Sequence, residues 1–90
     1  MPRVVDVSIV GRILGFLEGR GASTVTELVR GARVGFSTAR FYLRWLGERG
    51  LVRIDRGARG SLRVSITDRG RELLRLIREV ESMLGVQHEG

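Results

Sequence analysis

The 90-residue chain contains no cysteine and no lysine, and only one proline and one histidine. Without cysteine, disulfides, thiolate zinc sites and thiol nucleophiles are excluded. The only histidine, His88, falls near the end of the chain, and no pair of carboxylates or nucleophile with a matching base stands out. The sequence therefore predicts a protein that is not an enzyme and that holds no metal ion or cofactor.

Long apolar runs are also missing. No stretch approaches the roughly 18 residues that a membrane-spanning helix needs. The N-terminus lacks the charged-then-apolar order of a signal peptide. We therefore expect a cytoplasmic protein with no membrane partner, built as a single unit because so short a chain fills only one core.

Acidic residues are scarce. The chain has ten of them against sixteen basic residues, all arginine, for a net charge of +6. The excess is local, because residues 20–67 hold ten arginines and three acids, whereas residues 68–90 hold four arginines and five acids. Such asymmetry favours a polyanionic partner, whose phosphates or guanines a guanidinium grips with paired hydrogen bonds. The missing lysine has a second explanation, the charge or codon habit of a thermophile or a GC-rich genome.

Apolar residues in the first half of the chain recur every three or four positions, which is typical of helices with one buried face. The first predicted helix spans 7–17, with Asp6 as its N-cap. A short second helix begins after Thr24 or Thr26, which are overlapping start signals, and a third spans 36–49.

The period then changes to two. Residues 52–55 and 62–66 alternate between apolar and polar, and a loop with glycines at both ends joins them, which predicts a β-hairpin. Thr67 is suited to cap a last helix that ends near residue 84. The predicted fold class is mainly α with a small, two-stranded β-hairpin.

Helix, helix, turn, helix and a basic hairpin is the order of elements in winged helix-turn-helix proteins. Residues 64–74 also resemble the junction that follows the wing in these families. The layout is most similar to small archaeal winged-helix repressors and chromatin proteins that dimerise through a C-terminal helix. The stretch 24–54 resembles the winged-helix repressor pattern through Thr24, Val25, Glu27, Leu28, Ser37, Thr38, Leu43, Leu46, Gly50, Leu51 and Val52.

The resemblance implies a winged helix-turn-helix DNA-binding domain over 1–67, a C-terminal dimerisation helix over 68–85 and a flexible tail over 86–90. Two positions depart from the pattern. Arg33 stands where these families usually have glycine, and Gly35 stands where they have a serine or threonine cap. The register of the turn between the second and third helices stays open at this stage.

The third helix is expected to turn its apolar positions inward and its other face toward DNA. Phe41 is expected to be exposed there, in contact with a thymine methyl or with a second copy of the chain. A solvated arginine face is the alternative. The predicted contacts on this helix are Ser37, Thr38, Arg40, Phe41 and Arg44.

On the hairpin we predict DNA contacts from Arg53 and Arg59, with Arg56 and Arg63 also in outward or loop positions. Arg59 at the tip is the best candidate for a phosphate or minor-groove contact. For Arg53 and Arg63 the alternative role is protection of a strand edge by charge.

The last helix carries apolar residues at spacings of four, three and four, flanked by Leu76 and Met83. This stripe predicts a homodimer, with simple core packing as the alternative. Its members are Leu73, Ile77, Val80 and Leu84.

The sequence thus favours a transcription regulator that binds double-stranded DNA as a homodimer. The third helix would lie in the major groove and the wing on the adjacent backbone or minor groove. A sequence-tolerant nucleoid protein would use the same surface. A winged-helix protein-interaction module is a third interpretation, against which the arginines argue. No small-molecule effector is identifiable from the residues.

Overall fold

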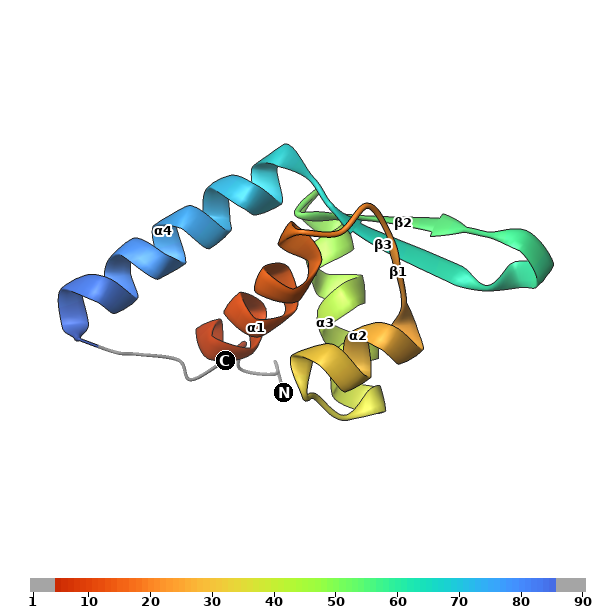
Figure 1. Ribbon diagram of the computed structural model, residues 1–90, viewed down its shortest axis with the longest axis horizontal. Helices are drawn as coiled ribbons and strands as arrows, with labels where there is room; N and C mark the ends of the chain where they lie inside the picture. The colour runs from red at the N-terminus through yellow and green to blue at the C-terminus, as the bar shows by residue number, and fades with distance from the viewer. Residues whose placement is uncertain (1–4, 86–90) are drawn as a thin grey trace.

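A computed structural model describes residues 5–85, so that the predicted tail, with His88, lies outside the described residues. The predicted fold class is confirmed: three helices, a β-hairpin wing and a C-terminal helix (Figure 1). A single 3-10 turn, Ala58–Gly60, forms the tip of the wing. The elements are α1 (Val7–Glu18), β1 (Ser23–Thr24), α2 (Val25–Ala32), α3 (Phe36–Glu48), β2 (Val52–Arg56), β3 (Leu62–Ile66) and α4 (Asp68–Leu84).

Local hydrogen bonds fix where the first two helices begin. The backbone N–H of Ser8 donates to Oδ1 of Asp6 at 2.8 Å, which confirms Asp6 as the N-cap of α1. Of the two predicted starts for α2, Thr24 is the cap, because its hydroxyl accepts from the N–H of Glu27 while the Glu27 carboxylate accepts from the N–H of Thr24. That backbone hydrogen bond is the main reason why the pKa of Glu27 is lowered.

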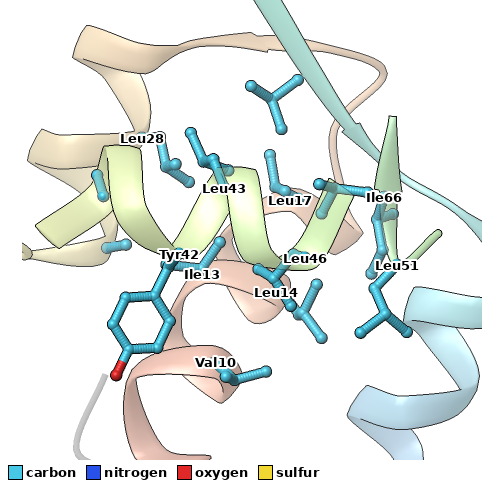
Figure 2. Close-up of a cluster of buried hydrophobic side chains, with 14 of the residues drawn as sticks. Val10, Ile13, Leu14, Leu17, Leu28, Tyr42, Leu43, Leu46, Leu51 and Ile66 are labelled. Carbon is cyan, nitrogen blue, oxygen red and sulfur yellow. The ribbon is translucent and has the colours of Figure 1, made fainter. Parts of the chain in front are cut away.

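The core lies where the apolar stripes of α1 and α3 meet (Figure 2). Tyr42 contributes its ring to this cluster, while its hydroxyl reaches the edge and accepts a hydrogen bond from the backbone N–H of Asp6 at 2.8 Å. The buried residues with no exposed surface include Ile13, Leu14, Leu17, Leu28, Ala39, Leu46 and Val64.

The sheet contains a strand that the sequence did not predict. This strand is β1, and the antiparallel sheet has the order β1-β3-β2. On the central strand, Val64 pairs with Ser23 of β1 on one side and with Ile54 of β2 on the other. The added strand has two residues, too few to show an alternating pattern. It forms because the extended N-cap conformation of Thr24 lays the chain beside β3.

A close junction joins the wing to α4. The hydroxyl of Thr67 donates to the carbonyl of Gly50 at 2.7 Å and accepts from the N–H of Gly70 at 3.0 Å. From this junction α4 and the wing extend toward opposite ends of the molecule (Figure 1). Among residues 5–85, none of the helices combines the length and apolarity that crossing a bilayer requires.

Candidate nucleic-acid interface

The turn between α2 and α3 is made by Arg33. Arg33 adopts the left-handed conformation at φ 57° and ψ 48°, which is the conformation that favours glycine. The guanidinium of Arg12, from α1, donates through Nε to the carbonyl of Ala32 at 3.1 Å and also donates to the carbonyl of Arg33. Gly35 is the N-cap of α3 and provides no side-chain cap. These contacts settle the register that the sequence left open.

On α3, the structure exposes three of the five predicted DNA contacts. Ser37, Arg40 and Arg44 are exposed, while Thr38 is half-buried. Arg44 lies 3.8 Å from the Glu48 carboxylate, both in largely exposed positions. Such an ion pair contributes little, so Arg44 can exchange Glu48 for another anion.

The expected exposure of Phe41 is wrong. Its ring is half-buried and packs against the core cluster. It also makes an edge-to-face contact with the ring of Tyr42, with the ring centroids 5.4 Å apart. A helical aromatic side chain lies along the helix surface, so the direction of its Cβ alone does not fix its exposure. The exposed aromatic of α3 is instead Phe36, at the first position of the helix, with 54% of its surface accessible. In the sequence, the position of Phe36 one helical turn before Arg40 was the feature that could have indicated this exposure.

The wing places its two predicted contacts apart, with Arg53 on one face of β2 and Arg59 at the tip. Alternation along β2 puts Arg53 and Asp55 on one face and Ile54 and Arg56 on the other. Arg53 is engaged by Asp55, with Nε 3.0 Å from the carboxylate. Arg59 lies at the tip, exposed, in the left-handed conformation at φ 58°.

Between α3 and the wing lies a hollow with a volume of about 410 Å³. Arg40 and Arg44 line it from α3, and Ile54 and Leu62 line it from the wing. We call this the α3–wing hollow; its remaining lining residues are Val25, Phe41, Leu43 and Val64. The structure thus brings the α3 arginines beside the Ile54 face of the wing, and Arg53 belongs to the opposite face.

Ion pairing differs between this surface and α4. Within residues 5–85, no carboxylate lies within ion-pair distance of Arg40, Arg56, Arg59 or Arg63. Three of the four arginines of α4 are paired: Arg71 with Asp68, Arg75 with Glu72 and Glu79, and Arg78 with Glu18. The hydrogen bond from Arg75 lowers the pKa of Glu72, which favours the ionised pair. α3 and the wing therefore carry exposed arginines without a carboxylate partner, whereas most arginines of α4 are paired. Within residues 5–85, the other arginines outside ion pairs are Arg12, Arg20, Arg30, Arg33, Arg49 and Arg69.

The predicted stripe on α4 is divided between core and surface. Ile77 is only 6% exposed and belongs to the core cluster, and Leu73 is half-buried against that cluster. Val80 and Leu84 are 54% and 73% exposed, and Leu76 and Met83 are exposed beside them. Ile77 turns inward because, in a helix of 3.6 residues per turn, it lies on the side of Leu74 and Gly70, which faces the rest of the chain.

Comparison with known proteins identifies the fold. The structure resembles Sso10a-2, a DNA-binding protein from Sulfolobus solfataricus, with a TM-score of 0.81 and 23% identity over 91% of this chain and 83% of that one. A MarR-family transcriptional regulator from Silicibacter pomeroyi gives a TM-score of 0.76 and 28% identity, over 80% of this chain and 49% of its own. The M. tuberculosis transcriptional regulator MosR, in complex with DNA, gives 0.74 and 24%, over 86% and 56%.

The chain thus spans about half the length of these two regulators. No curated protein sequence matches it. The family model for winged helix-turn-helix proteins, however, matches residues 5–85, which is nearly the whole chain. The chain belongs to the winged helix-turn-helix family.

Proposed function

We propose that this protein binds double-stranded DNA as a homodimeric transcription regulator, through α3 and the wing. The observation that carries the proposal is the group of exposed arginines on these elements that have no carboxylate partner within residues 5–85, among them Arg40, Arg56 and Arg59. Phosphates supply the missing negative charge, and their neutralisation releases counterions, which drives binding. The resemblance to a DNA-binding protein and to a regulator in complex with DNA supports the same partner.

In this proposal α3 enters the major groove, which is wide enough to admit a helix. Arg40 and Arg44 lie one turn apart and are exposed, so both can reach base edges or the phosphates that flank them. The wing then lies along the adjacent backbone, and Arg59 at its tip reaches a phosphate or the minor groove.

The proposed dimer forms through residues 68–85. The exposed apolar side chains of α4 gather on one face of the helix, as positions 76, 80, 83 and 84 do in a 3.6-residue repeat. Burial of this face against a second copy removes apolar surface from water. A two-fold dimer reads two half-sites about one helical turn of DNA apart.

A sequence-tolerant chromatin protein is the second candidate, because α3 offers few side chains that read bases. Thr38 is half-buried and Arg44 has Glu48 beside it, which leaves Arg40 and Ser37 as the exposed polar groups without such a neighbour. The two candidates differ in whether one duplex is preferred over others.

The test compares two arginines by fluorescence anisotropy across a salt series. Arg59→Asn keeps a residue that tolerates the left-handed conformation and removes the charge. It should weaken binding to all duplexes alike and lower the salt slope by about one unit per lost phosphate contact. Arg40→Ala should cost about 1–3 kcal/mol on a preferred duplex and less on random DNA.

The matched control is Arg75→Ala, which removes the same charge from α4, where Arg75 is paired with Glu72 and Glu79. Its binding and salt slope should stay near those of the wild type. If all three variants bind as the wild type does, α3 and the wing are not the DNA surface. Equal losses on every duplex for Arg59→Asn and Arg40→Ala, with no preferred sequence, would favour the chromatin protein.

A further inference from the structure

Phe36 stands out among the exposed side chains of α3. It is the first residue of the helix, with 54% of its surface accessible, whereas Phe41 and Trp45 pack against the core. Of the large apolar residues that are exposed within residues 5–85, it is the only aromatic. A ring in this position has not been used to fill the protein's own core.

Its neighbours along the helix are the proposed DNA contacts. Phe36, Arg40 and Arg44 follow one another at intervals of four, which places them in one row on the surface of α3. All three are exposed, and the two arginines line the α3–wing hollow. A surface that meets DNA through Arg40 and Arg44 therefore carries Phe36 at its leading end.

The N-terminal residues of a recognition helix are the ones that contact base edges in the major groove. Most groups on these edges are hydrogen-bond donors and acceptors, which a phenyl ring cannot satisfy. The exception is the 5-methyl group of thymine, an apolar group that projects into the major groove. The chemistry of Phe36 thus matches one feature of one base.

We infer that Phe36 is a specificity-determining residue that packs against the 5-methyl group of a thymine. This inference rests on the proposed binding of α3 in the major groove. It assigns to Phe36 the thymine contact that the sequence pattern suggested for Phe41, whose ring is engaged with the core.

The test removes the methyl group from the DNA and the ring from the protein in a double-mutant cycle. The wild type first selects its preferred duplex from a random pool, and the thymines of that duplex are then replaced by deoxyuridine. Wild-type affinity should fall about fourfold, the effect of one methyl group no longer buried. For Phe36→Ala the thymine-to-uracil affinity ratio should be about fourfold smaller than for the wild type, because changes in DNA flexibility affect both proteins and cancel when the two ratios are compared.

Two further variants serve as controls for the thymine contact. Phe36→Leu keeps an apolar contact and should retain a reduced preference for thymine. Val7→Ala removes an apolar side chain of similar exposure, 57%, from α1 and should keep the full wild-type ratio. Because Phe36 is exposed, its variants should melt as the wild type does.

The outcomes separate the inference from the proposed function. Tight wild-type binding with the same thymine-to-uracil ratio in the wild type and Phe36→Ala overturns the inference and leaves DNA binding intact. Selection of no preferred duplex also overturns it, because a specificity residue then has nothing to read. Absence of wild-type binding to any duplex overturns both.

Discussion

Replacement of Gly70 with alanine tests how closely α4 is held against the backbone of Leu51, the residue before β2. Gly70 lies in the first turn of α4, buried, with its N–H bonded to the Thr67 hydroxyl. A Cβ at this position would lie 2.8 Å from Cγ1 of Ile66 and closer still to the carbonyl oxygen of Leu51. The Leu51 carbonyl belongs to the backbone and cannot rotate away, so α4 must shift.

The magnitude follows from two opposing effects. Overpacking costs about 1–3 kcal/mol, and we take the upper end because backbone is the obstruction. Alanine recovers about 1 kcal/mol of helix propensity. The net loss of about 2 kcal/mol lowers the melting temperature by about 8–16 °C in a domain of this size.

Thermal melting by circular dichroism gives the measurement, and Gly15→Ala is the matched control. Gly15 lies inside α1, where a Cβ would be 3.7 Å from Nη2 of Arg78, an ordinary contact. That variant should gain up to about 1 kcal/mol of helix propensity and melt about 4–8 °C higher. A Gly70→Ala protein that melts at or above the wild type would refute the close packing of α4 on Leu51.

The remaining predictions concern the dimer and the cap of α2. Joint replacement of Val80 and Leu84 by glutamate should give a folded monomer in sedimentation, whereas Ile77→Glu should unfold the chain because its site is buried; a monomeric wild type would contradict the proposed dimer. Thr24→Ala should cost about 1 kcal/mol in chemical denaturation. Because folding lowers the pKa of Glu27, its stabilisation is present above the ordinary value of 4.5 and is lost as the pH falls through the lowered value. Glu27→Gln should therefore lose less stability in acid than the wild type, and equal acid sensitivity would contradict this.

Most of the fold could be predicted from the periodicity of apolar residues and from the residues that cap helices. The apolar spacing of α1 and α3, the alternation in the hairpin and the cap at Thr67 all predicted elements that the structure contains. The two-residue β1 was not predicted, because it has no alternating pattern of its own and exists only through its pairing with β3. The choice between Thr24 and Thr26 also needed the structure, since both residue types can cap a helix.

At the candidate site, the family, the order of the elements and the concentration of arginine between residues 20 and 67 could be predicted from the residues alone. Which side chains remain available to a partner depended on how the chain packs in three dimensions. Ile77 turns toward the core, and Phe41 packs partly against the core while it lines the α3–wing hollow. Phe36 is left on the surface. The physical reason is that composition and helical spacing are local properties. Burial and charge pairing depend on which distant segments fold against each side chain.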